Sequence, residues 1–341
     1  MKVVCHTEQK RHYPLHFLVN GVFRPNPEQP ERLDRLRQAA IQAGCRHETP
    51  LAHGMEPIAA VHTEPYLDFL ERAWERWSRI EGGAPAVTPN VHPNRRSVGY
   101  PASVVAQAGY HMADLAAPLA TGSWTSILWS AWTAVHAARL VLDGERGAYA
   151  LCRPPGHHAF SDMAGGFCYL NNSAIGAQLL RRAHPRVAIL DVDLHHGNGT
   201  QAIFYERGDV LTVSIHADPE RFYPFFWGYA GETGAGAGAG CNMNLPLARG
   251  SGDESFLAAL DTALARIADY APGALVVALG LDAFEGDPFG GLRVSTDGFG
   301  EVGRRIASRL ALPTLLVQEG GYLCDGLGDN LASFLQGFGV D

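Results

Sequence analysis

Asp193 and His195 place a carboxylate and an imidazole two residues apart. In an extended segment, residues i and i+2 point the same way, so both side chains can reach one ion. Asp282, which closes the apolar run 274–282, can supply a third ligand. Two carboxylates and one imidazole leave a coordination position open, as a catalytic metal requires. These residues predict a catalytic metal site, although a carboxylate and a histidine at this spacing also occur as ordinary loop residues.

The identity of the metal follows less directly from the ligand types. Oxygen and nitrogen ligands admit zinc, iron(II), manganese or cobalt, and the order of affinities does not select among them. We predict Zn²⁺ as the cofactor and keep Fe²⁺ as the alternative. A non-haem iron oxygenase is a competing class, but such enzymes normally use two histidines and one carboxylate, and here the ratio is reversed.

Further groups suited to hydrolysis follow turn-forming residues. The doublet His157–His158 comes after a Pro-Pro-Gly turn and is suited to general acid–base catalysis. Tyr322 follows two glycines, which allow the backbone to approach a ligand closely, and its phenol can stabilise an oxyanion. The alternative is that these are surface or core imidazoles and a core aromatic ring. Their position beside the predicted metal site favours catalysis.

The elements that must position these groups alternate between two patterns. Strand-like runs occupy 148–153, 186–192, 210–216, 274–282 and 314–319, and helical spacing occupies 171–183, 198–207, 253–270 and 297–310. The alternation predicts an α/β fold with a mainly parallel sheet and helices on both faces. In such sheets ligands bind outside the carboxyl ends of the strands. Because all five runs end in ionisable residues, we predict a single reaction centre there.

The N-terminal part is less regular. Helical patterns occur at 31–43, 64–80, 102–117 and 124–142, and the stretch 82–101 is rich in proline. We predict a long loop at 82–101, of the kind that is commonly functional or makes subunit contacts. We find no internal repeat or domain linker, so we predict a single catalytic domain, 1–341, with an insertion at about 82–101. The Gly-Ala stretch 234–240 lacks the register of a phosphate loop and is predicted as a flexible surface loop.

Composition excludes several classes of protein. The chain has 341 residues, of which 46% are hydrophobic and 18% charged, with a formal net charge of −8. No basic stripe is present, which argues against nucleic-acid binding. No apolar run has the length of about 20 residues needed to span a membrane, and the first residues lack a secretory signal, so we predict a cytoplasmic protein. The six cysteines form no CxxC pair, which argues against disulfides and a structural zinc finger.

Six segments are more specific than these patterns. They are RPPGHH (153–158), GGFCYLNN (165–172), DVDLHHGNGTQ (191–201), SIHAD (214–218), LGLDAF (279–284) and EGGY (319–322). Together they resemble the histone deacetylase and acetylpolyamine amidohydrolase superfamily, which has an arginase-like fold. VHTEPYLDFL (61–70) extends the similarity over nearly the whole chain.

The resemblance implies a catalytic role for each matching residue. The zinc ligands would be Asp193, His195 and Asp282, and Tyr322 would polarise the substrate carbonyl. His157 and His158 would form a tandem dyad, His157 paired with Asp191 and His158 with Asn198. A charged partner favours imidazolium and a neutral one does not, so we predict His158 as the general base and His157 as an electrostatic stabiliser.

The resemblance also implies a substrate tunnel and a second cation. Gly166, Phe167 and Tyr223 would line a narrow tunnel for the alkyl chain of the substrate. A structural K⁺ would be held by Asp191, Ser214 and the backbone carbonyls of Asp193, His195 and Ile215.

Within the superfamily, the 82–101 loop resembles the insertion of the acetylpolyamine amidohydrolases. That insertion packs across a dimer interface and narrows the tunnel, so we expect a homodimer and a small-molecule acetylated amine as substrate. Relatives carry acidic residues near the tunnel mouth, whereas the aligned positions here carry Phe17 and Ala116. Acetylputrescine or acetylcadaverine is therefore a better proposal than longer acetylpolyamines.

Three alternative functions remain open at this point. A protein lysine deacetylase of the same fold would share every motif, and a hydrolase of another small amide is also compatible. A non-catalytic binder of acetylated ligands would have no need for the three metal ligands, the two histidines and the tyrosine together.

Overall fold

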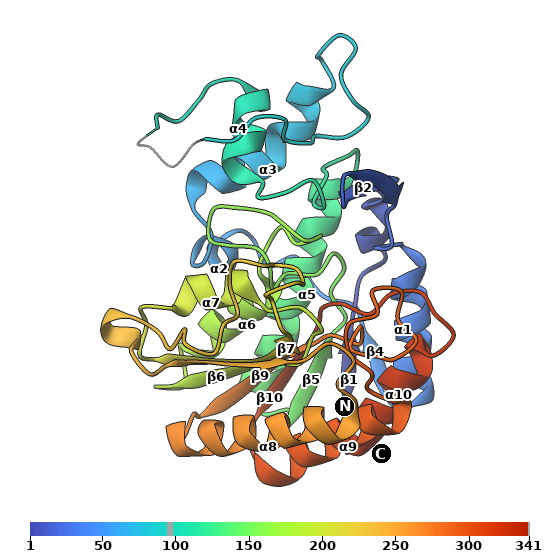
Figure 1. The fold of residues 1–341 in the computed structure, drawn as a ribbon, viewed down its shortest axis with the longest axis vertical. Coiled ribbons are helices and arrows are strands. Elements are labelled where there is room, and N and C mark those ends of the chain that lie inside the picture. Colours follow the sequence, from blue (N-terminus) through green and yellow to red (C-terminus); the bar gives the residue numbers. More distant parts are fainter. Residues whose placement is uncertain (94–97, 340–341) are drawn as a thin grey trace.

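A parallel β-sheet forms the centre of the molecule (Figure 1). The computed structural model describes residues 1–93 and 98–339. In spatial order the eight strands are β4 (Arg46–Glu48), β1 (Lys2–Val4), β5 (Gly147–Ala150), β10 (Thr314–Gln318), β9 (Ala274–Leu279), β6 (Val187–Asp191), β7 (Val210–Ala217) and β8 (Asn242–Leu247). Every neighbouring pair is parallel. The predicted α/β class is confirmed.

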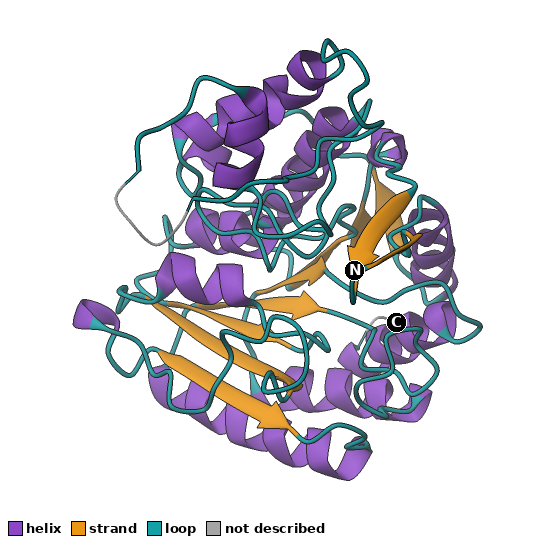
Figure 2. Cartoon of the chain, turned by 45° about the horizontal axis from the view of Figure 1, so that its top comes forward, coloured by secondary structure: helices purple, strands orange, loops and turns teal. Residues whose placement is uncertain are grey.

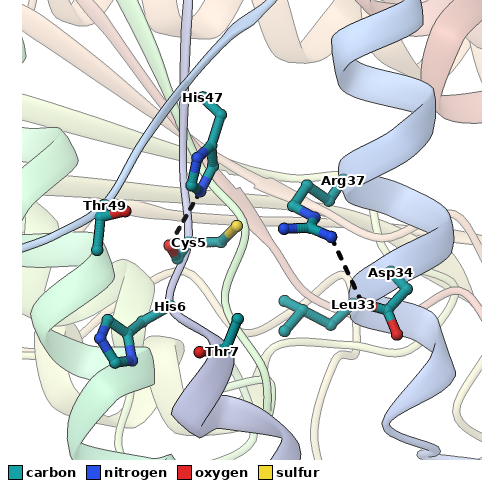
Figure 3. Close-up of a pocket in the computed structure, with 8 residues that line it drawn as sticks. All are labelled: Cys5, His6, Thr7, Leu33, Asp34, Arg37, His47 and Thr49. Atoms are coloured by element: carbon teal, nitrogen blue, oxygen red, sulfur yellow. Dashed lines mark hydrogen bonds and ion pairs between the residues drawn. The ribbon is translucent and has the colours of Figure 1, made fainter.

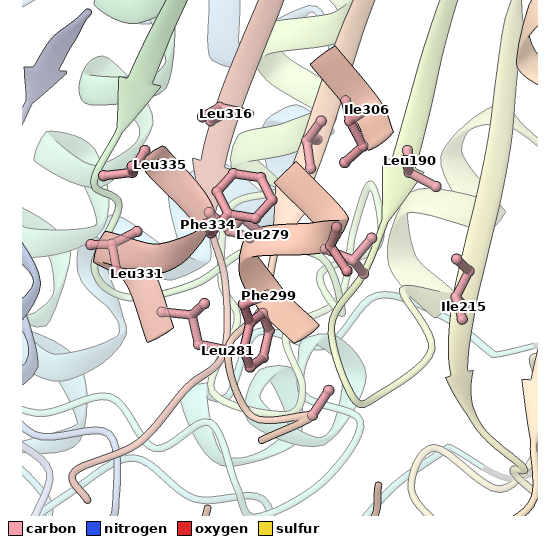
Figure 4. Close-up of a cluster of buried hydrophobic side chains, with 14 of the residues drawn as sticks. Leu190, Ile215, Leu279, Leu281, Phe299, Ile306, Leu316, Leu331, Phe334 and Leu335 are labelled. Atoms are coloured by element: carbon pink, nitrogen blue, oxygen red, sulfur yellow. The ribbon is translucent and has the colours of Figure 1, made fainter. Parts of the chain in front are cut away.

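Helices cover both faces of this sheet because alternate strand residues are apolar on each side. In β5, Tyr149 belongs to one buried cluster, and Ala148 and Ala150 belong to the other. The first cluster packs against α1 (Glu31–Gln42), α8 (Asp253–Tyr270), α9 (Thr296–Arg309) and α10 (Leu327–Phe338), as Figure 4 shows for part of it. The second packs against α2 (Glu56–Ala59), α3 (Glu64–Trp77), α4 (Val104–His111), α5 (Ser123–Leu142), α6 (Asn172–Leu180) and α7 (Asn198–Phe204).

A group of peripheral elements projects away from the sheet. Figures 1 and 2 show α3, α4 and the described residues between them on the far side of α5 and α6. A separate two-stranded hairpin, β2 (His16–Val19) and β3 (Val22–Pro25), lies near them. Residues 82–93 and 98–101 form no helix or strand, as predicted, and 94–97 of the predicted loop lie outside the described residues.

Several elements differ from the sequence predictions. Strands β1, β4 and β8 were not predicted, since β1 and β4 have three residues each, too few to show a period. The glycine-rich stretch 234–240, predicted as a flexible surface loop, is mostly exposed and contains a 3₁₀ turn, Gly236–Gly238. A Cβ on Gly238 would lie 2.4 Å from the carbonyl oxygen of Tyr205, so glycine permits a close backbone approach there.

The strand order brings together segments that are distant in the sequence. Strand β9 lies between β6 and β10, and β10 lies between β9 and β5. The carboxyl ends of β5, β10, β9, β6 and β7 are therefore neighbours, and each precedes one of the predicted site segments. Among the helices of the described residues, none is both long and apolar enough to cross a membrane.

Candidate active site

Asp193, His195 and Asp282 converge at the carboxyl ends of β6 and β9. Their ligand atoms all lie within 4.8 Å of one another, and all three residues are buried. Nδ1 of His195 lies 3.1 Å from Oδ2 of Asp282 and 3.3 Å from Oδ1 of Asp193. The three predicted ligands thus form one compact donor set.

Backbone amides fix the orientation of the two carboxylates. The amide of Gly320 donates to Oδ2 of Asp193 at 2.7 Å, and the amide of Leu194 donates to Oδ1 of Asp282 at 3.0 Å. Oδ1 of Asp193 also accepts from the amide of His195 at 2.8 Å, so both oxygens of Asp193 and one oxygen of Asp282 are held by the backbone. Partners of this kind preorganise metal ligands.

The electrostatics of this cluster suit a cation. Burial and the neighbouring charge of Asp193 raise the pKa of Asp282. Burial opposes the charged form of His195, but Asp193 and Asp282 outweigh it and raise its pKa to about 9. Two buried carboxylates that face each other need a positive charge between them. A divalent metal would supply that charge, so the donor types and their environment fit the predicted ion.

A second group, His157, Cys168 and Glu319, also has ligand atoms within 4.8 Å of one another. The carboxylate of Glu319, however, already accepts hydrogen bonds from the amides of Gly156 and His157 and from the hydroxyl of Ser173, at 2.7, 3.0 and 2.7 Å. Burial raises the pKa of the Cys168 thiol well above its ordinary value, which disfavours the thiolate that a metal needs. Glu319 thus holds the loop that follows β5. The cluster of Asp193, His195 and Asp282 is therefore the better candidate for a metal site.

The two histidines lie side by side but have different partners. Their ring centroids are 4.0 Å apart. Nδ1 of His157 lies 2.9 Å from Oδ2 of Asp191, and Nδ1 of His158 lies 2.7 Å from Oδ1 of Asn198. The structure thus places Asp191 and Asn198 as the resemblance implied.

These partners shift the two imidazoles in opposite directions. Burial alone would lower the pKa of His157, but the carboxylates of Asp193 and Asp191 raise it well above its ordinary value. Burial, together with the positive charge of His157, lowers the pKa of His158 well below its ordinary value. One histidine is therefore suited to carry charge and the other to be neutral.

Tyr322 packs against Phe289, whose ring also contacts His195, and both its backbone and its ring have further partners. Its amide donates to Oδ2 of Asp287 at 2.9 Å, and the guanidinium carbon of Arg32 lies 4.9 Å from its ring centroid. Arg32 also donates to the carbonyl of Gly321 at 2.6 Å, and it forms a buried ion pair with Glu28. Burial raises the pKa of the Tyr322 phenol well above its ordinary value, so it remains a hydrogen-bond donor at neutral pH.

Aromatic rings surround the approach to the cluster. Phe167 packs against Phe17 and Tyr322, with centroid distances of 5.3 and 5.9 Å. Tyr223 stands edge-on to His158 at 4.9 Å. Gly166 lies close to both His158 and Tyr223: a Cβ there would be 2.5 Å from Cδ2 of His158 and 2.8 Å from the hydroxyl of Tyr223. The three predicted tunnel residues therefore all lie beside the dyad or the tyrosine.

Several site residues were missed by the sequence analysis. Phe289 packs 4.8 Å from Tyr322 and 5.4 Å from His195, and Phe222 stacks on His195 at 5.2 Å. Phe289 follows Asp287 and Pro288, shortly after a predicted ligand, and Phe222 precedes a predicted tunnel residue, so proximity to known motifs was an available signal. No local pattern marks Arg32, which acts from a helix distant in sequence.

The residues predicted for K⁺ lie at or just after the carboxyl end of β6 and within β7. Asp191 and Ser214 are register partners in adjacent strands β6 and β7. The hydroxyl of Ser214 lies 2.8 Å from Nδ1 of His216. Among the hydrogen bonds of the described residues, none is accepted by the backbone carbonyls of Asp193 or His195. These carbonyls are thus available to a cation. Ile215, whose carbonyl completes the predicted set, is buried next to Ser214.

A hollow at the β1–β4 edge of the sheet is separate from this site (Figure 3). It is lined by Cys5, His47 and Arg37, among other residues. Burial raises the pKa of Cys5 to about 11, and Arg37 is paired with Asp34. The hollow therefore offers neither a reactive thiol nor a free cation.

The fold and the site together define a class of protein. The histone deacetylase domain matches residues 26–338. The chain belongs to the histone deacetylase family and is a hydrolase that acts on amides.

Within that family, relatives named acetylpolyamine amidohydrolase match nearly the whole chain. It is 47% identical over 344 residues to the acetylpolyamine amidohydrolase of Burkholderia pseudomallei, an alignment that covers 100% of this chain and 99% of that protein. It is 46% identical over 343 residues to acetylpolyamine amidohydrolase 1 of Pseudomonas aeruginosa, which covers 99% of each. A crystal structure of acetylpolyamine aminohydrolase from Burkholderia pseudomallei matches with a TM-score of 0.96 and 46% identity, covering 99% of this chain and 98% of that one. The resemblance drawn from the six segments is confirmed.

Proposed function

We propose that the protein is a zinc-dependent deacetylase of small N-acetylated amines that releases acetate and the free amine. Its substrates would be acetylpolyamines, with acetylputrescine or acetylcadaverine preferred. The observation that carries the proposal is the convergence of Asp193, His195 and Asp282 beside the paired imidazoles and Tyr322. The names of the two relatives support the substrate class.

Asp193, His195 and Asp282 would hold the metal, Zn²⁺ or alternatively Fe²⁺. Bound there, the ion would act as a Lewis acid toward the acetyl carbonyl and lower the pKa of a water molecule. The three ligands come from two loops that follow adjacent strands, so the sheet itself sets their spacing.

The remaining residues would move protons and stabilise charge. The amide oxygen of Asn198 can only accept, so Nδ1 of His158 carries the hydrogen and its Nε2 is free to take a proton from water. We therefore assign His158 as general base and, later, as the acid that protonates the leaving amine. Both nitrogens of His157 face carboxylates, Asp191 at 2.9 Å and Asp193 at 3.8 Å, so it would remain charged and stabilise negative charge. Tyr322 would donate a hydrogen bond to the developing oxyanion.

The aromatic walls support a small, unbranched substrate. Phe17 is 8% exposed and packs in one cluster with Phe167 and Tyr322, against which the partly buried Ala116 also lies. Neither position offers a carboxylate to a distant ammonium group. This composition favours a short acetylated diamine over a longer polyamine.

Three further assignments belong to this proposal. A structural K⁺ would occupy the site of Asp191, Ser214 and the carbonyls of Asp193, His195 and Ile215. The chain would act as one cytoplasmic catalytic domain. It would form a homodimer through the 82–101 insertion, whose Val91, Val98 and Tyr100 are 53%, 46% and 48% exposed. Light scattering on wild type and on the double variant Val91→Lys, Val98→Lys tests the dimer.

A substrate panel tests the proposed reaction. Acetate release is measured from acetylputrescine, acetylcadaverine, acetylspermidine and an acetyllysine peptide, with Zn²⁺- or Fe²⁺-loaded protein and with a chelator. We expect release to be abolished by the chelator and fastest with the diamines. Faster turnover of the peptide would identify a protein lysine deacetylase, and absence of release from every compound with either metal would refute the reaction.

A further inference from the structure

Asp114 connects three segments of the tunnel wall. It lies in the loop between α4 and α5, and its side chain is partly buried. Oδ2 accepts a hydrogen bond from the hydroxyl of Tyr223 at 2.8 Å, and Oδ1 accepts one from the amide of Ala116 at 2.8 Å. The amide of Gly166 donates to both oxygens, at 3.2 and 3.4 Å. One carboxylate thus links its own loop to the two segments that carry the tunnel residues.

The first of these segments has a strained backbone. Gly166 and Phe167 have φ values of 51° and 68°, so both are in the left-handed region. For a bulky residue such as Phe167 this conformation is unfavourable and persists only where the surrounding structure fixes it. The amide of Gly166 points to Asp114, and a Cβ on Gly166 would lie 2.8 Å from the hydroxyl of Tyr223. Backbone hydrogen bonds between Gly165 and Cys168 close the turn, and Asp114 adds the side-chain contact that ties Gly166 to the neighbouring loop.

The second segment presents the ring of Tyr223 to the dyad. That ring is nearly perpendicular to His158, with an interplanar angle of 89°. Because the hydroxyl is bonded to Asp114, the ring edge is fixed and its position relative to the Gly166–Phe167 turn is set by one carboxylate. Asp114 is therefore placed to control the separation of the two walls.

We propose that Asp114 is a positioning residue that holds the Gly166–Phe167 turn and the Tyr223 ring at the separation that an unbranched alkyl chain requires. The inference rests on the proposed function in assigning the alkyl chain of the substrate to this tunnel. Asp114 itself touches neither the metal ligands nor the reacting atoms. Its loss would reduce the contribution of each methylene group to binding while leaving the groups at the metal cluster in place.

Straight-chain alkyl hydroxamates measure that contribution without turnover. The hydroxamate group chelates the metal, and the alkyl chain extends into the tunnel. Calorimetric titration of the Zn²⁺-loaded protein with the series from acetohydroxamate to hexanohydroxamate gives the gain in affinity for each methylene. In wild type we expect about fourfold per methylene, the value for full burial of one CH₂ group.

Three variants separate positioning from a structural role. In Asp114→Ala the gain should fall below about twofold per methylene, while acetohydroxamate binding, metal content and the melting temperature stay close to wild type. Asp114→Asn should recover most of the gain, because an amide can accept from Gly166 and donate to the hydroxyl of Tyr223. Tyr223→Phe removes the hydroxyl that donates to Asp114 but leaves the hydrogen bond between the amide of Gly166 and Asp114. The gain in this variant should therefore be intermediate.

Two results would overturn the inference: an unchanged gain in Asp114→Ala, or an equal loss of affinity for every hydroxamate including acetohydroxamate. If Asp114→Ala does not fold, Tyr223→Phe decides, since an unchanged gain there removes the proposed link. A protein that binds the series as expected but releases no acetate contradicts the proposed function alone. A wild-type affinity independent of chain length contradicts the tunnel inference alone.

Discussion

Nδ1 of His158 lies 2.7 Å from the amide oxygen of Asn198, whereas the adjacent His157 points its own Nδ1 at a carboxylate. A neutral acceptor orients an imidazole without favouring its charged form, and a carboxylate favours that form. Two neighbouring histidines of one loop therefore differ in the charge state they favour, which supports the proposed roles of His158 as general base and His157 as charge stabiliser.

The first prediction concerns the relative importance of these histidines. General acid–base catalysis contributes about 10²–10⁴-fold, so His158→Ala should lower kcat by an amount in that range. His157→Ala should lower kcat less, because it removes a stabilising charge and not the proton acceptor. Steady-state kinetics on an acetylated diamine, with metal content measured for each variant, checks this order. The opposite order would reverse the assignment.

The second prediction concerns the phenol of Tyr322. Tyr322→Phe should reduce kcat by about 10²–10³-fold, the usual effect of removing one oxyanion donor. The fold should be unaffected, because the amide of Tyr322 still donates to Asp287 and Arg32 still packs on the ring. Circular dichroism and metal analysis serve as controls. Normal turnover by this variant would exclude the assigned role.

The third prediction concerns metal and stability. A ligand that binds only the folded state stabilises it, so Zn²⁺ added to metal-free wild type should raise the melting temperature in a concentration-dependent way. Asp282→Asn removes a buried ligand and should abolish most of that increase. Asp218→Asn alters an exposed carboxylate outside the cluster and serves as the matched control. The same increase in Asp282→Asn as in wild type would show that the metal binds elsewhere.

The fourth prediction concerns the charge at the tunnel. Ala116 is partly exposed, so Ala116→Glu can place a carboxylate beside Phe17 without burying it fully. A solvent-accessible ion pair with the distal ammonium should raise kcat/KM for acetylspermidine relative to acetylputrescine by about threefold to fivefold, and salt should weaken the effect. Ala116→Gln, which lacks the charge, should not change the ratio. Equal ratios in the two variants would argue against a charge effect.

The convergence of Asp193, His195 and Asp282 was predictable because its signals are local. Asp193 and His195 are two residues apart after an apolar run, and Asp282 ends another such run, so period and position sufficed. The family resemblance then supplied partners such as Asn198, which no spacing rule reveals. The five central strands were found because they are apolar and five or more residues long, apart from β5, which has four.

Contacts between loops were not predictable in this way. Asp114 and Arg32 act on site residues that are 109 and 289 positions away in the sequence. Only the strand order and the packing of the loops bring them together, and neither leaves a periodic pattern in the chain. The short strands β1 and β4 were missed for a related reason: β1 is specified by pairing with β5, and β4 by pairing with β1, and neither by its own composition.

The fifth prediction concerns stability in acid and depends on His62. This buried imidazole accepts a hydrogen bond from the amide of Asn171 at 2.9 Å, and burial lowers its pKa to about 4. Between pH 6.5 and 4 the unfolded chain therefore binds a proton that folded His62 does not. The contribution of His62 to the stability of the fold is fully present above this window and is lost as the pH decreases through it. The loss between pH 7.5 and 5 should be about 2 kcal/mol from this group.

Urea denaturation at pH 7.5 and pH 5 measures this loss. His62→Gln keeps an acceptor for Asn171 but cannot be protonated, so its stability should decrease between the two pH values by about 2 kcal/mol less than that of wild type. His16→Gln replaces an exposed histidine and should behave as wild type. If wild type and His62→Gln lose the same stability, the acid sensitivity arises from other groups.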